Sequence, residues 1–193
     1  MRPRLIIMAK EPRAGRVKTR LGQDIGLVPA AWWYRHQLAR LTRRLTDPRW
    51  DITLAVAPDS ALTSRALPAG TRRAQGPGDL GARMERLLRA ERPAPAVLIG
   101  SDIPGVTPAH IARALHSLAS HDMVFGPSED GGFWLVGLSP SAPAPRPLFR
   151  NIRWSSPQTL ADTRAQLGHL RLATTDTLRD VDTLADLPAS LCP

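Results

Sequence analysis

Positively charged side chains gather directly after the first apolar run of the sequence, residues 5–9. Lys10, Lys18 and Arg20 follow this run, together with Gly15. Glycine lets a backbone approach a ligand closely, ammonium groups supply point charge, and guanidinium groups bind two oxygens at once. The stretch therefore predicts a phosphate-binding loop, with a solvated arginine-rich loop as the alternative.

The basic stretch is not a Walker A loop. That loop requires the pattern Gly-x-x-x-x-Gly-Lys-Ser/Thr, whereas Gly15 stands alone and Lys18 follows it closely. Pro12 and Gly15 also disfavour a helix through residues 10–21. We therefore expect an irregular loop that leaves a strand.

A carboxylate, Asp102, follows the most strand-like apolar run. Residues 97–99 are all branched or aliphatic, the pattern of a parallel strand that is covered on both faces, and Gly100 and Pro104 end the run. Open α/β sheets bind ligands beyond the carboxyl ends of such strands. Asp102 is therefore a candidate metal ligand; the alternative is that it only shapes the turn.

The segment 76–81 matches the Gly-x-Gly-x-x-Gly pattern of dinucleotide-binding folds, and Asp102 follows about 20 residues later. Two observations argue against that fold. Residues 71–75 are too polar for its central strand, and the pattern lies in the middle of the chain. We expect instead a flexible loop that contacts a nucleotide base or sugar, with a plain turn capped by Asp79 as the alternative.

Two further acidic positions lie later in the chain. Asp130 follows the apolar run 123–126 and precedes Gly131 and Gly132, so it belongs either to a hairpin turn or to a ligand site at a strand end. Asp182 lies in the closing segment and is either a helix cap or a metal ligand.

Apolar spacing indicates an alternation of strands and helices. The clearest helix is 29–45, because Tyr34, Leu38, Leu41 and Leu45 share one face. The expected strands are 5–9, 52–57, 71–75, 97–99, 123–126, 133–138 and 170–173. Shorter helices are expected around 61–67, after Thr107-Pro108, after Ser156-Pro157 and within 180–187, with a proline-rich loop at 139–147. This alternation predicts an α/β fold.

Length and charge limit the functional classes. The 193 residues predict a single domain, 1–193. Lysine and arginine number 26 against 17 acidic residues, and the resulting net charge of +9 favours an anionic partner. Because the arginines are scattered, without a basic tail or interleaved aromatic residues, we expect phosphorylated small molecules and no nucleic acid.

Targeting and cysteine signals are few. No apolar run approaches the roughly 18 to 20 residues that span a bilayer, and the first apolar stretch is too short for a signal peptide. We therefore expect a cytoplasmic protein with no membrane partner. Cys192 is the only cysteine, which excludes an intrachain disulfide and a cysteine-based zinc site.

An ordered set of motifs covers almost the whole chain and resembles a known family. The motifs are Lys18-Thr19-Arg20-Leu21, Gly78-Asp79-Leu80-Gly81-x-Arg83-Met84, Gly100-Ser101-Asp102-Ile103-Pro104, Gly126-Pro127 with Asp130-Gly131-Gly132, Trp154-Ser155 and Asp180-Val181-Asp182-Thr183. In this order they resemble the uncharacterised glycosyltransferase-like family that is related to 2-phospholactate guanylyltransferase, within the GT-A nucleotide-diphospho-sugar transferase superfamily.

The resemblance implies a mixed, mostly parallel sheet flanked by helices, with Mg²⁺ or Mn²⁺ bound by Asp102 and by a second carboxylate. Asp130 is the first choice for that second ligand and Asp182 the second. Lys18, Arg20 and Asp102 would be catalytic. The implied nucleotide contacts are Lys10, Gly15, Lys18, Arg20, Gly78, Asp79, Gly81, Ser101, Gly131 and Gly132.

The resemblance also implies the activity. We expect a metal-dependent transferase that binds a nucleoside triphosphate or a nucleotide sugar and uses a second molecule as acceptor. Members that transfer sugars often carry Asp-x-Asp at the metal strand, whereas Ser101-Asp102-Ile103 supplies one acid, so nucleotidyl transfer is slightly favoured over glycosyl transfer. The alternatives are a nucleotide-binding accessory protein without catalysis and, less favoured, a nucleic-acid-binding protein.

Overall fold

One seven-stranded sheet organises the molecule in a computed structural model that describes residues 1–187. The strand order is β3-β2-β1-β4-β6-β5-β7. Strand β6 runs antiparallel to β4 and β5, and every other pair is parallel. The strands are β1 (Arg4–Lys10), β2 (Asp51–Ala57), β3 (Thr71–Ala74), β4 (Ala96–Ile99), β5 (Met123–Pro127), β6 (Phe133–Leu138) and β7 (Leu172–Thr174). The expected mixed, mostly parallel sheet is thus confirmed.

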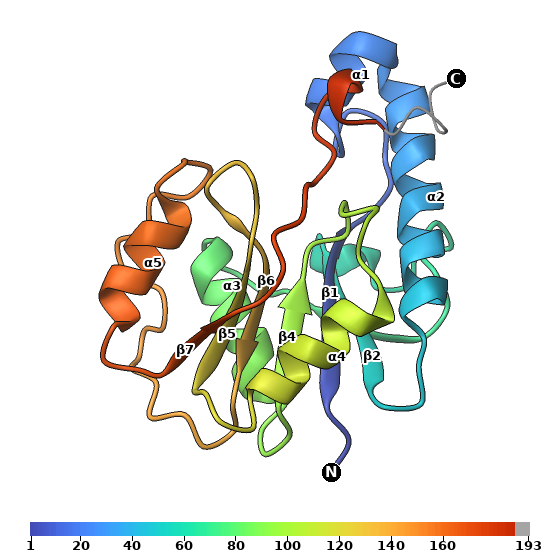
Figure 1. The fold of residues 1–193 in the computed structure, drawn as a ribbon. Coiled ribbons are helices and arrows are strands. Elements are labelled where there is room, and N and C mark those ends of the chain that lie inside the picture. The colour runs from blue at the N-terminus through green and yellow to red at the C-terminus, as the bar shows by residue number, and fades with distance from the viewer. Residues whose placement is uncertain (188–193) are drawn as a thin grey trace.

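Helices cover both faces of this sheet (Figure 1). They are α1 (Thr19–Ile25), α2 (Leu27–Leu45), α3 (Leu80–Ala90), α4 (Pro108–Ser117) and α5 (Thr159–Leu167), with short 3₁₀ turns η1 (Asp59–Ala61) and η2 (Leu184–Asp186). Helices α2 and α4 pack on one face, and α3 and α5 on the other. The central strands are therefore buried on both sides, as their continuous apolar sequences predict.

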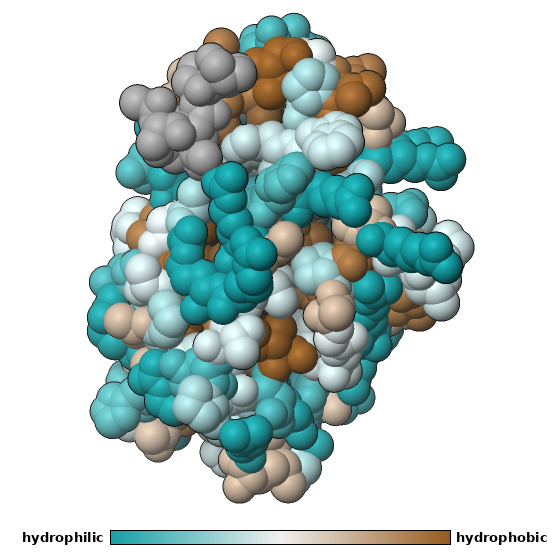
Figure 2. All heavy atoms as spheres, turned by 90° about the vertical axis from the view of Figure 1, so that its right-hand side faces the viewer, coloured by the Kyte–Doolittle hydropathy of each residue, from teal (hydrophilic) through white to brown (hydrophobic). Residues whose placement is uncertain are grey.

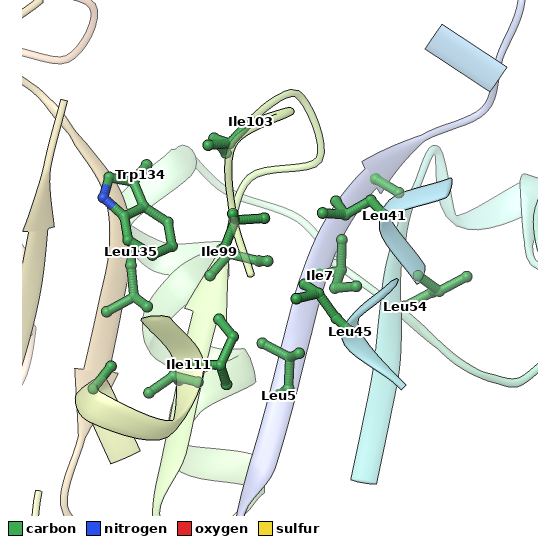
Figure 3. Packing of buried hydrophobic residues seen from close by; sticks show 14 of the residues in the cluster. Leu5, Ile7, Leu41, Leu45, Leu54, Ile99, Ile103, Ile111, Trp134 and Leu135 are labelled. Atoms are coloured by element: carbon green, nitrogen blue, oxygen red, sulfur yellow. The ribbon is translucent and has the colours of Figure 1, made fainter. Parts of the chain in front are cut away.

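Alternation along β1 shows how the two cores are built. Leu5 and Ile7 point into the core under α2 and α4, whereas Ile6 points into the core over α3 and α5. Leu41 of α2 and Ile111 of α4 meet the sheet in the first core (Figure 3). Shortening a fully buried side chain such as Leu41 to alanine costs about 2–5 kcal/mol, so both cores hold the strand ends firmly in place.

The outer surface of α2 changes character along the helix. Leu27, Val28 and Trp32, near its start, are exposed. Figure 2 shows apolar residues gathered at the upper end of this face, while hydrophilic side chains dominate below them. None of the helices within residues 1–187 has the length and apolar character of a membrane span. Cys192 lies outside the described residues.

The first helix differs from the sequence-based expectation. Helix α1 begins at Thr19, inside the segment that was expected to be irregular throughout. Pro12 and Gly15 precede it, and Lys18 adopts the left-handed conformation, with φ 47° and ψ 47°, immediately before the helix. Pro12 and Gly15 therefore keep only the residues before Lys18 irregular, and the helix begins immediately after Lys18.

Two other local expectations are wrong. No helix spans 61–67 beyond η1, because the Arg72 guanidinium binds the carbonyls of Leu62, Ser64, Leu67 and Pro68 in place of helical amides. The pair Ser156-Pro157 also favours Ser156 as the cap of the following helix. Helix α5 instead begins at Thr159 with Gln158 at its N-cap position, and Ser156 does not cap it.

Candidate active site

A cleft of about 710 Å³ opens at the carboxyl ends of β1 and β4. The chain reaches it from β1, the loop before α1, the start of α3, the turn after β4, the β5–β6 hairpin and the segment after β7. The predicted site residues that line it are Lys10, Lys18, Arg20, Gly78, Asp79, Ser101, Asp102, Asp130, Gly132 and Asp182. The sheet therefore brings together segments that lie far apart in the sequence.

Three predicted nucleotide contacts lie off the cleft surface, in the part of the chain that the structure describes. Gly15 is exposed in the turn before α1. A Cβ at Gly81 would lie 2.8 Å from Phe149 and Trp154, and one at Gly131 would lie 2.1 Å from the Pro157 carbonyl oxygen. Gly81 and Gly131 are thus required by close packing around the cleft.

Three carboxylates meet in the cleft. Asp102, Asp180 and Asp182 each offer one oxygen, and these oxygens all lie within 4.8 Å of one another. The backbone N–H of buried Val181 donates to the Asp102 carbonyl at 3.1 Å, which fixes the late segment against the turn after β4. Asp180 was not among the predicted ligands. The signal that could have found it is the spacing of two acids around one apolar residue.

Lys18 connects two of these carboxylates. Its Nζ lies 2.5 Å from Asp102 Oδ2 and 2.9 Å from Asp182 Oδ1, and its side chain is only 8% exposed. Arg20 approaches Asp182 from the solvent side at 3.3 Å. Burial by itself lowers the pKa of Lys18, but the charges and hydrogen bonds of Asp102 and Asp182 outweigh it and raise this pKa above 10.5. Lys18 is therefore an ammonium ion.

Asp180 has no such partner among the described residues. Burial, and then the negative charges of Asp102 and Asp182, raise its pKa above 3.8. Three carboxylates facing one buried ammonium leave an excess of negative charge. Hard divalent cations such as Mg²⁺ and Mn²⁺ prefer oxygen ligands of this kind. The donor set therefore fits such a cation.

Tyr34 holds the basic strand end and the acidic turn together. Its hydroxyl accepts a hydrogen bond from the Lys10 backbone N–H at 3.0 Å and bonds Ser101 Oγ at 2.8 Å. Burial raises the pKa of Tyr34, although the bond to Ser101 partly opposes this shift. The sequence placed Tyr34 on the buried face of α2 but did not indicate this role.

The other half of the cleft is apolar. Trp154 makes edge-to-face contacts with Phe133 and Phe149, at centroid distances of 6.3 Å and 5.8 Å. The lining residues that belong to the core over α3 and α5 are Met8, Met84, Leu98, Phe133, Val136 and Trp154. This half therefore offers a surface suited to a ring or another apolar group.

Asp79 and Asp130 lie on the rim of the cleft. Asp79 caps α3 by accepting from the Ala82 N–H at 2.8 Å, which is the alternative that the sequence left open for this residue. Asp130 stands at the β5–β6 hairpin, where its Oδ1 accepts from the Gly132 N–H at 2.9 Å. It lines the cleft but is not a member of the three-carboxylate group. Of the two carboxylates considered as partners for Asp102, Asp182 is the one that meets it.

Several solved structures have the same fold. A protein from Desulfovibrio desulfuricans G20 described as a "putative nucleotide-diphospho-sugar transferase" is 30% identical over 95% of this chain and 84% of its own, with a TM-score of 0.87. The 4-diphosphocytidyl-2C-methyl-D-erythritol synthase of Anaerococcus prevotii DSM 20548 is 10% identical over 96% and 94%, with a TM-score of 0.56. Rv0371c from Mycobacterium tuberculosis H37Rv, in complex with manganese, is 15% identical over 96% of each chain, with a TM-score of 0.53.

The chain thus has the fold of the nucleotide-diphospho-sugar transferase, or GT-A-like, class. Within that class the chain belongs to the family DUF2064, described as "Uncharacterized protein conserved in bacteria", whose model matches residues 40–156. Among curated proteins, none matches the chain in sequence.

Proposed function

We propose that this protein is a metal-dependent transferase that acts on a nucleoside triphosphate or a nucleotide sugar, with nucleotidyl transfer favoured. The observation that carries the proposal is the meeting of Lys18 and Arg20 with Asp102, Asp180 and Asp182 in one cleft. Phosphoryl-type transfer depends mainly on positioning and on charge stabilisation. Positive side chains beside a carboxylate group supply both.

The basic side of the cleft suits the phosphates. Lys10 ends β1, Lys18 precedes α1, and Arg20 lies in the first turn of that helix. Their charges would orient a polyphosphate and offset the negative charge that grows on the leaving group. Tyr34 would keep the Lys10 backbone and Ser101 at fixed positions while this happens.

The carboxylates suit a divalent cation. Asp102 with Asp180 or Asp182 would hold Mg²⁺ or Mn²⁺, which supplies Lewis-acid stabilisation of phosphate oxygens when bound. The manganese complex of Rv0371c supports this choice of metal class, since that protein has the same fold.

The order of the strands suggests where the acceptor binds. Lys10 ends β1, Asp102 follows β4, and Phe133 begins β6, in that order along the sheet edge. In nucleotidyl transfer the reacting phosphate lies between the leaving group and the acceptor. With the leaving group on the Lys10 side, the acceptor would lie on the apolar side, against Phe133 and Trp154.

Two observations favour nucleotidyl transfer. The turn after β4 contributes one acid, Asp102, and the Anaerococcus neighbour is named for a diphosphocytidyl product. In nucleotidyl transfer an acceptor oxygen bonds to the α-phosphorus and pyrophosphate leaves. In glycosyl transfer the acceptor oxygen bonds to the anomeric carbon and a nucleoside diphosphate leaves.

A ligand screen tests the proposal. The melting temperature would be measured with each of the four nucleoside triphosphates and with common nucleotide sugars, with and without Mn²⁺. A ligand that binds the folded state raises the melting temperature by mass action, and we expect at least one nucleotide to do so only with metal. Release of pyrophosphate or of nucleoside diphosphate, by transfer to water or to an added acceptor, then identifies the reaction. The absence of any metal-dependent shift would contradict the proposal.

A further inference from the structure

Lys18 occupies oxygens that a bound metal would need. Its ammonium group contacts Asp102 Oδ2 at 2.5 Å and Asp182 Oδ1 at 2.9 Å, and these two residues belong to the three-carboxylate group. An ammonium ion and a divalent cation compete for the same carboxylate lone pairs. These ion pairs therefore place an ammonium group where a cation would bind.

The position of Lys18 is specific. Its side chain is almost fully buried, whereas that of Arg20 is 72% exposed and reaches only Asp182. Lys18 also adopts a left-handed backbone conformation, which residues with a side chain rarely adopt and which is typical of functional sites. The fold therefore aims this one ammonium group at the acids.

A displaced Lys18 needs another anion. A buried ammonium group without a partner is strongly disfavoured. In the same cleft, the phosphates of a bound nucleotide would lie beside Lys10 and Arg20 and would supply that anion. Metal and phosphate together therefore satisfy both the carboxylates and Lys18, whereas metal alone leaves Lys18 unpaired.

We propose that Lys18 is an exchangeable counter-ion that couples metal binding to phosphate binding. It neutralises Asp102 and Asp182 in the ligand-free protein, leaves them when the divalent cation binds, and then pairs with the nucleotide phosphates. This inference rests on the function proposed above. Each ligand consequently favours binding of the other, beyond their direct contact.

Mn²⁺ titration followed by electron paramagnetic resonance provides the first test. In the absence of nucleotide, Lys18→Met is expected to bind Mn²⁺ about tenfold more tightly than the wild type, because the competing ammonium is gone. Arg20→Met is the matched control. It removes one positive charge from the same group but leaves Asp102 and its contact with Lys18 intact, so its gain is expected to be clearly smaller.

Amine labelling provides the second test, and the small number of amines in the chain makes the labelled sites easy to distinguish. The chain has only two lysines, Lys10 and Lys18, and the α-amine of Met1 at the far end of β1 is a well-exposed reference. An acylating reagent followed by mass spectrometry would give the labelling of Lys18 relative to Met1. Mn²⁺ alone is expected to raise this ratio about tenfold, and an equimolar mixture of Mn²⁺ and inorganic tripolyphosphate to lower it again.

The outcomes separate this inference from the proposed function. If Mn²⁺ binds the wild type but Lys18→Met binds it no more tightly than Arg20→Met does, or if Mn²⁺ leaves Lys18 unlabelled, the exchange is refuted and the metal site stands. If neither the wild type nor Lys18→Met binds Mn²⁺, with or without tripolyphosphate, the metal-dependent function fails and the exchange fails with it.

Discussion

The two halves of the cleft are held together by different forces. In the charged half, Lys18 reaches Asp102 and Asp182 across sequence separations of 84 and 164 residues, and ion pairs join the segments. In the apolar half, Trp154 packs on Phe133 and Phe149 and covers the backbone of Gly81. We therefore expect that replacing a charged side chain mainly changes ligand binding, whereas replacing an apolar one mainly changes stability.

The largest effect is expected at Asp102. Asp102→Asn keeps the shape of the side chain but removes the negative charge, so the affinity for Mn²⁺ should fall at least about 100-fold. The fold should persist, because the side chain is 28% exposed and lies outside both apolar cores. Isothermal titration with Mn²⁺ measures the loss.

Asp176→Asn is the control for Asp102→Asn, because Asp176 pairs with Arg113 at the surface, outside the lining of the cleft. Its affinity for Mn²⁺ should match that of the wild type. Equal losses in the two variants would show that general charge, not a metal site, governs binding.

A smaller effect is expected at Trp154, where stability should change and the affinity for Mn²⁺ should not. Trp154→Ala should lower the free energy of unfolding by about 1–3 kcal/mol, less than the cost at a fully buried aromatic residue because Trp154 is half-buried. Its affinity for Mn²⁺ should stay within about twofold of the wild type, as expected for a site with which it shares no partner. Urea unfolding measures the expected loss of stability, and Mn²⁺ titration measures the expected absence of an effect on metal affinity.

Trp32→Ala provides the matched comparison, since Trp32 is 57% exposed on α2. Its change in unfolding free energy should stay within about 0.5 kcal/mol. A large loss of Mn²⁺ affinity in Trp154→Ala would mean that the two halves of the cleft are not independent.

The smallest effect is expected at Asp180, where a substitution should raise the stability of the fold and lower the affinity for Mn²⁺. Because the pKa of Asp180 is raised above 3.8, the folded chain holds this proton more tightly than the unfolded chain does. The folded protein therefore loses stability as the pH rises from 3.8 through the raised pKa of Asp180. At pH 7 the charged carboxylate of Asp180 lowers the free energy of unfolding.

Asp180→Asn removes that cost, so the melting temperature at pH 7 should rise while the affinity for Mn²⁺ falls. The gain in melting temperature should shrink as the pH is lowered toward the raised pKa of Asp180, where the wild-type carboxyl becomes protonated. Melting curves of both proteins between pH 7 and pH 4.5 check the trend. A lower melting temperature for Asp180→Asn at pH 7 would contradict it.

Much of the sheet follows directly from local sequence. Apolar runs such as 133–138 coincide with strands, and the polar segment 71–75 coincides with β3 at the edge of the sheet. Asp102 could be identified because a strand of four buried residues ends just before it. These features depend on neighbouring residues, which is why a single sequence reveals them.

The rest of the site depends on contacts between distant segments. Asp180 is a member of the acid group only because the segment after β7 returns to β4 and binds the Asp102 carbonyl through Val181. The burial of Lys18 depends on its left-handed backbone, and lysine is not a residue type that signals this conformation. Local patterns therefore indicate which acids and which lysine could bind a ligand, but they do not indicate that these side chains contact one another in the folded chain.

A crystal structure with Mn²⁺ and the nucleotide selected by the ligand screen, with data collected for anomalous scattering of manganese, would show the metal site and Lys18 together. We expect one anomalous peak within bonding distance of Asp102 and of Asp180 or Asp182, with Lys18 moved onto the phosphates. A nucleotide bound without metal at these carboxylates, or with Lys18 still bridging Asp102 and Asp182, would contradict this expectation.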